Sequence, residues 1–260
     1  MTFYISHLFD DDETKIVLDD FQGDFILGIE TIDFAAGYFL DMKDDKVIEY
    51  QGRMGEYLEK HPISIHGPFL DLCPHSFDSA IRRATMERYE ETYRAAKLLG
   101  AKRIVFHSCL IPTVYYGSTW EDNSIDFWKE FLNGKDESIK IHIENVYETG
   151  YENMKNLIDR VGNPLLSICL DVGHAFCFSK IGVNEWVKEL GNRIGHVHIH
   201  NNDGGSDQHR PLGEGKLNIE EIIDLCLSIN NNMEFTVEMN SYEDALNSLE
   251  FLKEYKKRQS

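Results

Sequence analysis

Short apolar segments alternate with segments of helical periodicity along the whole chain, and this alternation constrains the fold more than any other feature. The apolar segments are rich in β-branched and aromatic residues and end at polar residues, Gly or Pro. They cover residues 2–6, 26–34, 63–69, 103–108, 140–146, 166–174, 195–202 and 235–240. Nearly continuous apolar character without strict alternation is typical of parallel strands that are covered on both faces. The pattern therefore predicts eight parallel strands.

The segments between these strands carry helix signals. The clearest covers 78–99, where apolar residues recur at helical spacing and Gly100 can adopt the left-handed conformation that ends a helix. Asn218, followed by Glu221, has the pattern of a capping box. Further helices are predicted at 120–133, 153–161 and 184–190, and from Ser241 onward.

Eight strands that alternate with helices over 260 residues match an α/β fold, a (β/α)8 TIM barrel that forms a single domain over residues 1–260. An open, doubly wound sheet is the alternative. That fold normally has a glycine-rich turn after its first strand, and the segment FYISHLFDDDET contains no glycine. We therefore favour the barrel.

Charge and composition limit the classes of partner that the protein can bind. The chain has 26 Lys and Arg against 45 Asp and Glu, a net charge of −19, which opposes binding to nucleic acid and anionic lipid. Its five cysteines are scattered, as expected for reduced thiols. No apolar run is long enough to span a membrane and no export signal is present, so we expect a cytoplasmic protein. No feature calls for a nucleotide or flavin, and a homo-oligomer is left open.

Polar residues stand at or near the carboxyl ends of six of the eight predicted strands. These residues are His66, His107, Glu144, Asp171, His198 and Glu238. In a TIM barrel all strand ends meet at one mouth, where active sites of this fold lie. The sequence thus predicts three carboxylates and three imidazoles around one cavity.

Buried carboxylates need a partner, because removing an isolated charge from water is very costly. Glu144, Asp171 and Glu238 have no Lys or Arg within their own strand ends. A divalent cation such as zinc or manganese satisfies a mixed shell of carboxylates and histidines. His66 alone could be a hydrogen-bonded core residue and Glu144 alone could form a salt bridge, but the set as a whole favours a metal site.

Other histidines and a glycine-rich loop add candidates. His174 follows Asp171 by three positions, and Asp207 and His209 lie in the loop at 201–215. We expect His142 and His196, which share strand faces with predicted ligands, and His200 to support the site through hydrogen bonds. We assign no role in the site to His61 and His75. Five aromatic residues could form a pocket wall or pack in the core: Tyr115, Tyr116, Trp120, Phe176 and Phe178.

The motifs resemble those of the xylose-isomerase-like TIM barrels, the superfamily that holds sugar isomerases and epimerases together with endonuclease IV. The likeness covers ISIHGPFLDL, RIVFHS, IHIENV, CLDVGHAF, HVHIHNNDGGSDQHRPLGEG and FTVEMN. The resemblance implies that four residues hold one divalent metal, as in ketose epimerases: Glu144, Asp171, His198 and Glu238. It also matches five residues to the additional ligands with which endonuclease IV binds three zinc ions: His66, His107, His174, Asp207 and His209.

The family implies a divalent-metal-dependent isomerase or epimerase that acts on a sugar, sugar phosphate or cyclitol. The metal would stabilise an enediolate, while Glu144 and Glu238 remove and return a proton and His174 hydrogen-bonds a substrate oxygen. His66 and His107 could also contact the substrate. Arg210 is the candidate for gripping a hydroxyl, carboxylate or phosphate at the mouth.

Three alternatives remain. An endonuclease IV-like zinc phosphodiesterase would use up to three ions, whereas isomerisation suits one. A lyase or dehydratase would share the metal and base, and a non-catalytic partner subunit would keep only the barrel. The negative charge, the few arginines in the loops and the short intervals between strands disfavour the nuclease. The sequence leaves the substrate, the choice among isomerase, epimerase and lyase, the metal and the oligomeric state open.

Overall fold

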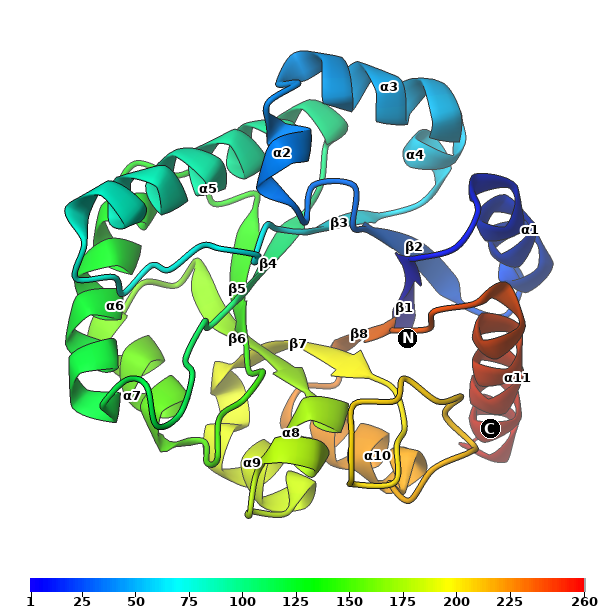
Figure 1. The fold of residues 1–260 in the computed structure, drawn as a ribbon. Helices are drawn as coiled ribbons and strands as arrows, with labels where there is room; N and C mark the ends of the chain where they lie inside the picture. The colour runs from blue at the N-terminus through cyan, green and yellow to red at the C-terminus, as the bar shows by residue number, and fades with distance from the viewer. Residues whose placement is uncertain (260) are drawn as a thin grey trace.

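Eight parallel strands close into a barrel in the computed structural model, which describes residues 1–259 (Figure 1). Each strand pairs with its neighbours in chain order, and β1 pairs with β8 to complete the ring. The strands are β1 (Thr2–His7), β2 (Ile26–Thr31), β3 (Ile63–His66), β4 (Arg103–His107), β5 (Lys140–Glu144), β6 (Leu166–Asp171), β7 (Ile194–Ile199) and β8 (Glu234–Val237). The predicted TIM barrel is confirmed.

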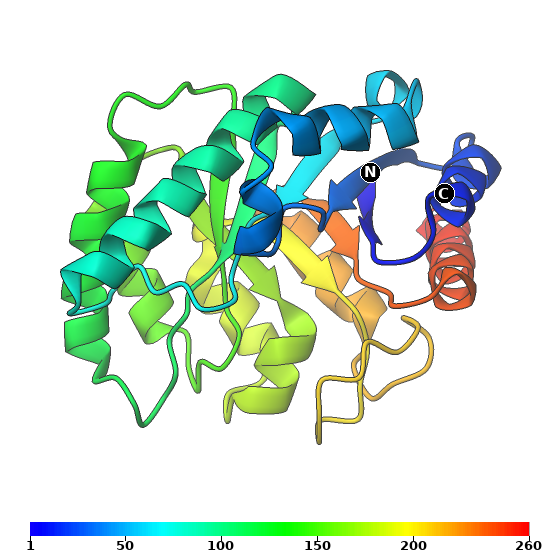
Figure 2. The same cartoon turned by 45° about the horizontal axis from the view of Figure 1, so that its top comes forward.

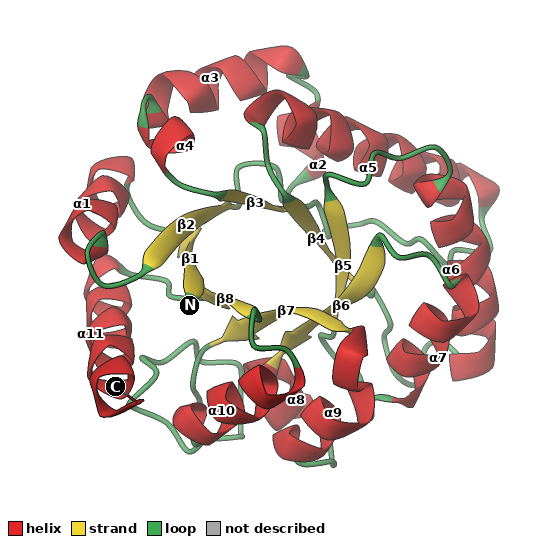
Figure 3. Ribbon diagram, turned by 180° about the vertical axis from the view of Figure 1, so that it is seen from behind, coloured by secondary structure: helices red, strands yellow, loops and turns green. Residues whose placement is uncertain are grey.

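The helices surround the strands as an outer ring (Figures 1 and 3). They are α1 (Asp11–Phe21), α2 (Gly37–Leu40), α3 (Asp44–Met54), α4 (Tyr57–Lys60), α5 (Ser79–Leu99), α6 (Gly117–Leu132), α7 (Glu152–Val161), α8 (Val172–Phe178), α9 (Val183–Leu190), α10 (Ile219–Ile229) and α11 (Tyr242–Gln259). A 3-10 turn at Gly191–Arg193 precedes β7. The long loop that follows β7 projects beyond the barrel (Figure 2).

The predicted helix ends follow from local capping. Asp78 accepts a hydrogen bond from the Ala80 amide at the start of α5, and Gly100 ends that helix with φ 69°. Asn218 caps α10 by accepting from the Glu221 amide. The helices α1 to α4 were not predicted. Of these, α2 and α4 have only four residues and no side-chain cap, so they carry almost no sequence signal.

The predicted strand at 166–174 is shorter in the structure. β6 ends at Asp171, whose carboxylate accepts a hydrogen bond from the His174 amide at 2.6 Å and so caps α8. His174 therefore lies in the first turn of a helix. Gly173 is required here, because a Cβ at this position would lie 1.9 Å from the His200 ring.

The core lies both inside the barrel and between the barrel and the helices. An aromatic cluster joins α5 and α6 to β4, where Tyr89 stacks on Phe106 with 3.9 Å between ring centroids and both rings contact Trp128. This packing fixes the strand that ends in His107. Among residues 1–259, no helix combines the length and apolar character that a membrane crossing requires.

Candidate metal centre and its cavity

A cavity of about 430 Å³ lies at the carboxyl ends of the strands. Seven of the predicted site residues line it: His66, His107, Glu144, His174, Asp207, His209 and Glu238. Asp171 and His198 are fully buried and contact this group from below. The structure thus brings all nine predicted metal-ligand candidates to one place.

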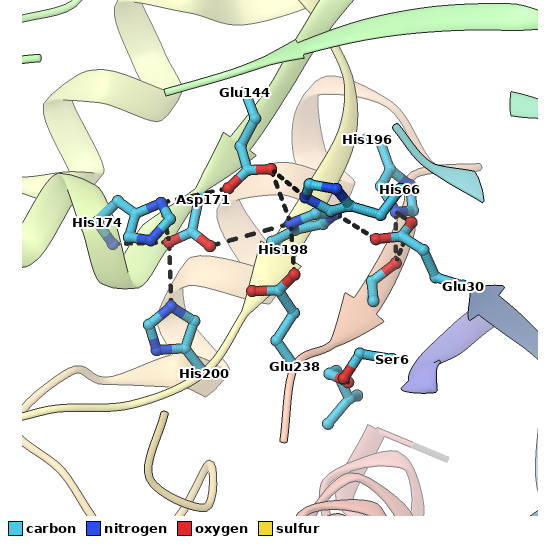
Figure 4. Close-up of polar contacts among 12 residues, drawn as sticks. Ser6, Glu30, His66, Glu144, Asp171, His174, His196, His198, His200 and Glu238 are labelled. Atoms are coloured by element: carbon cyan, nitrogen blue, oxygen red, sulfur yellow. Dashed lines mark hydrogen bonds and ion pairs between the residues drawn. The ribbon is translucent and has the colours of Figure 1, made fainter. Parts of the chain in front are cut away.

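His198 lies at the centre of the carboxylates (Figure 4). Its Nδ1 atom is 3.0 Å from Glu238 Oε1, 3.5 Å from Glu144 Oε2 and 4.0 Å from Asp171 Oδ2. Within residues 1–259, none of these three carboxylates forms an ion pair with Lys or Arg. Among the described residues, the ion pairs of these three carboxylates are therefore with histidines alone.

Four buried atoms in this group lack hydrogen-bond partners among the described residues. They are Glu144 Oε2, Asp171 Oδ2 and the two ring nitrogens of His198. Unpaired polar atoms are costly in a protein interior and are rare without a reason. Two carboxylate oxygens and one imidazole nitrogen that converge in this way are the donor set of a divalent cation. The residues present therefore fit the metal that the sequence predicts.

The protonation of the group follows from its charges. Burial opposes ionisation of Glu144, but the charges of His107 and His198 outweigh it and hold the pKa of Glu144 well below its usual range. Burial lowers the pKa of His198, yet Cys169, Glu238 and Glu30 around it raise that pKa well above its ordinary value. The Glu144 carboxylate is thus ionised, which is the form that binds a metal.

Two further groups of ligand-type side chains adjoin this centre. His174, His200, Asp207 and His209 each offer an atom within 4.8 Å of the others, as do His66, His107 and Glu144. Asp207 Oδ2 lies 3.2 Å from His174 Nε2 and 3.1 Å from His209 Nε2. The cavity floor, meaning these two groups with Asp171, His198 and Glu238, therefore has donors for more than one cation.

His200 belongs to the site more closely than the sequence indicates. Its Nε2 atom lies 3.2 Å from Asp171 Oδ1 and its ring stacks on His209 with 4.0 Å between centroids. It therefore orients Asp171, as expected of a supporting histidine, and is also a candidate ligand beside Asp207. The spacing of three histidines in HVHIH is the signal that could have identified it.

Glu30 on β2 was missed by the sequence prediction. Its side chain is buried, its Oε1 lies 2.9 Å from His198 Nε2, and its Oε2 accepts hydrogen bonds from Ser64 at 2.7 Å and Thr236 at 3.1 Å. Burial would raise the pKa of Glu30, but the charge of His198 lowers it to about 2. This carboxylate holds the ring so that Nδ1 faces Glu144 and Glu238. The sequence signal that could have identified Glu30 is a single acidic residue within an apolar strand.

His142 and His196 lie deeper in the barrel than the cavity floor. His142 Nδ1 is 2.7 Å from Ser167 Oγ, and His196 contacts Arg103 through Nδ1 at 2.6 Å and Thr236 through Nε2 at 2.7 Å. Ordinary hydrogen bonds pair these rings with protein groups. His196 adjoins the site through Glu30, at 3.7 Å.

Arg210 and the predicted aromatic wall do not line the cavity. The Arg210 guanidinium lies 3.4 Å from Asp203 Oδ2, within the loop that follows β7. The aromatic residues proposed for a pocket wall are also absent from the cavity lining. They are Tyr115, Tyr116, Trp120, Phe176 and Phe178. Trp120 is buried in the core, whereas Tyr116 is exposed. The five cysteines are unpaired, as predicted.

Fold and site together define a parallel (β/α)8 barrel with a carboxylate and histidine cluster at its mouth. The sequence model of the xylose isomerase-like TIM barrel family matches residues 27–255, so the chain belongs to this family. An uncharacterized protein of Methanocaldococcus jannaschii is 30% identical over 203 residues, which make up 74% of this chain and 69% of that protein.

Solved structures support the same assignment. The crystal structure of a D-tagatose 3-epimerase-like protein aligns with a TM-score of 0.81 and 26% identity, over 99% of this chain and 97% of that one. A Thermus thermophilus protein, whose crystal was soaked with zinc chloride, aligns with a TM-score of 0.72 and 22% identity over 98% of both chains. At 22% identity, the likeness to the Thermus thermophilus protein shows that the two proteins share a fold.

Proposed function

We propose that this protein is a divalent-metal-dependent sugar isomerase or epimerase that transfers a proton at the carbon beside a carbonyl group. The observation that carries the proposal is the convergence of Glu144, Asp171 and Glu238 on His198 Nδ1, all within 4.0 Å and without a Lys or Arg partner among the described residues. The likeness to a D-tagatose 3-epimerase-like protein supports a sugar as substrate.

Within this proposal the residues divide the work by their exposure to the cavity. Asp171 and His198 are fully buried and would hold the ion, together with Glu144 and Glu238. When bound, the ion supplies Lewis acidity that polarises the substrate carbonyl. Glu144 comes from β5 and Glu238 follows β8, and their carboxylates reach toward His198 from opposite sides in Figure 4.

Two opposed carboxylates suit proton removal on one face of a substrate and return on the other. One of Glu144 and Glu238 takes the proton and the other returns it, which inverts the carbon between them. A single base acting alone would instead move the carbonyl between adjacent carbons. His174, at the cavity edge, donates a hydrogen bond to a substrate oxygen.

The test is hydrogen exchange in deuterated water. With added manganese or zinc, D-tagatose or D-fructose should acquire deuterium beside the carbonyl, as measured by NMR. Glu144→Gln and Glu238→Gln should each abolish this exchange, whereas Glu189→Gln, on the surface of α9, should leave it intact. Exchange that persists in both site variants would refute the assignment of the two glutamates.

A zinc phosphodiesterase is the second candidate, because the cavity floor offers donors for several ions. A metal cluster suits hydrolysis of a phosphodiester better than enolisation. Metal analysis of protein purified without chelator, combined with an assay on abasic DNA, separates the two. About three zinc ions per chain together with cleavage would favour the hydrolase; one ion with no cleavage would favour the isomerase. A lyase on this scaffold would release a leaving group during the exchange assay.

A further inference from the structure

One side of the cavity is built from apolar side chains. This surface, the apolar wall, comes from the segments that follow β1, β2, β3 and β5, including helix α2. It consists of Leu8, Ile32, Ala35, Ala36, Phe39, Phe69, Leu70, Val146 and Tyr147. Apart from the Tyr147 hydroxyl, these side chains offer no hydrogen-bond donor or acceptor. A polyol that lay against this wall would leave hydroxyl groups unsatisfied.

The apolar wall is continuous with the cavity floor and is held in place. Phe69 stacks on His107 with 4.3 Å between ring centroids and meets His66 edge-on at 5.5 Å. The Phe69 amide donates a hydrogen bond to the Ala35 carbonyl at 3.3 Å, which joins the loops after β2 and β3. A ligand held at the floor would therefore touch the wall with its next atoms.

The outer part of the wall is open to water. Leu70 is 56% exposed, Tyr147 is 49% exposed and Leu8 is 37% exposed. Apolar side chains that gather at a cavity mouth are typical of a ligand-binding surface, because covering them releases water.

The cavity lacks the side chains that usually bind an anionic group. Among the described residues that line it there is no Lys or Arg, while Glu144, Asp207 and Glu238 are acidic. The nearby Lys46 lies over the Phe39 ring at 4.7 Å and is paired with Asp33 and Glu49 at 3.2 and 2.9 Å. A phosphate or carboxylate group that lay against the apolar wall, away from the histidines and the proposed metal of the floor, would thus find no Lys or Arg as a counter-charge.

We propose that the substrate is a neutral carbonyl sugar that carries an apolar substituent, such as a keto sugar linked to an aryl aglycone. The sugar lies at the cavity floor and the substituent lies against the apolar wall. This inference rests on the proposed function and adds the substrate class to it. Neutrality follows from the absence of Lys and Arg from the cavity lining, and the apolar substituent follows from the missing hydrogen-bonding groups of the apolar wall.

Binding of three probes to the zinc-loaded full chain tests the inference. The probes are D-glucose, phenyl β-D-glucopyranoside and D-glucose 6-phosphate, and calorimetry or ligand-observed NMR measures their dissociation constants. We expect the phenyl glucoside to bind at least about tenfold more tightly than D-glucose, as burial of a phenyl ring predicts. The phosphate should bind more weakly than D-glucose.

Substitutions in the apolar wall test whether the preference for the phenyl glucoside arises from contacts with this wall. Phe39→Ala combined with Leu70→Ala should reduce the advantage of the phenyl glucoside to less than about threefold. Phe77→Ala is the matched control, because Phe77 is 75% exposed in the same β3 to α5 connection and does not line the cavity. Melting curves and zinc content verify that each variant is folded.

The outcomes separate this inference from the proposed function. Equal binding of D-glucose and phenyl glucoside, no binding of the phenyl glucoside, or tightest binding of the phosphate overturns the substrate class, even if deuterium exchange on free sugars is observed. A phenyl preference that the double variant abolishes supports the substrate class. If it occurs with no exchange on any carbonyl sugar, the isomerase proposal alone fails.

Discussion

The barrel interior contains two layers of polar side chains, and they differ in how their hydrogen bonds are satisfied. In the deeper layer His142 pairs with Ser167, and His196 pairs with Arg103 and Thr236. In the layer at the mouth, Glu144, Asp171 and His198 keep buried atoms without a partner among the described residues. The residue types are similar, so the hydrogen-bond partners, and not the residue types, distinguish the deeper layer from the layer that we propose binds a metal.

Glu30 joins the two layers. Its carboxylate contacts His198 above and lies 3.7 Å from His196 below. Because histidine ligands are normally oriented by a carboxylate or carbonyl on their other nitrogen, this arrangement supports the proposal that His198 holds a cation.

Glu144→Gln should have the largest effect on metal binding. The substitution removes a charge and a donor oxygen from the mouth layer while it preserves the side-chain shape. We expect zinc affinity, measured by calorimetry, to fall by more than about 100-fold, beyond the range of residues that only support ligands. Circular dichroism checks the fold. Unchanged affinity would show that the unpaired oxygen of Glu144 has no role in holding a cation.

Glu30→Gln should have a smaller effect through His198. An amide is uncharged and can present its NH2 group to His198 Nε2, so it orients the ring less firmly than a carboxylate. Zinc affinity should fall by about 10- to 100-fold. The NMR signals of the His198 ring should also shift, which a general loss of stability would not produce. An affinity equal to that of the unmodified protein would place Glu30 with the purely structural groups.

Two serine hydroxyls give the smallest and most direct comparison. Ser64→Ala removes the 2.7 Å hydrogen bond to Glu30, and Ser167→Ala removes the 2.7 Å contact to His142. Each should lower the free energy of unfolding by about 1 to 3 kcal/mol, since a buried polar group loses its partner. Only Ser64→Ala should weaken zinc binding, by a few-fold. Equal effects of both on affinity would remove the distinction between the layers.

The sequence was sufficient for the fold and for placing the nine ligand candidates at one mouth, because both depend on local rules. Short apolar runs predict parallel strands, and a barrel brings every strand end to one mouth, so His66 or Glu144 could be placed without knowledge of its neighbours. The helix signals of α5 and α10 are local in the same way.

The features that were missed depend on contacts between distant segments. Glu30 lies within a strand, and its role depends on His198, which comes from β7. The apolar wall includes Phe39 from the four-residue α2, which has no side-chain cap, and the sequence had suggested other aromatic residues for this purpose. Long-range pairings and loop conformations of this kind leave no periodic pattern in the chain.

The two oxygens of Asp171 differ in their contacts. Oδ1 accepts the His174 amide and so starts α8, whereas Oδ2 lies 4.0 Å from His198 Nδ1 and has no hydrogen-bond partner among the described residues. A relative that had lost catalysis would still need an acceptor at this position to begin the helix. Retention of Asp or Asn there is consequently a poor marker of activity in distant relatives. Under the proposed function, simultaneous retention of Glu144 and Glu238, which cap no helix, is the better one.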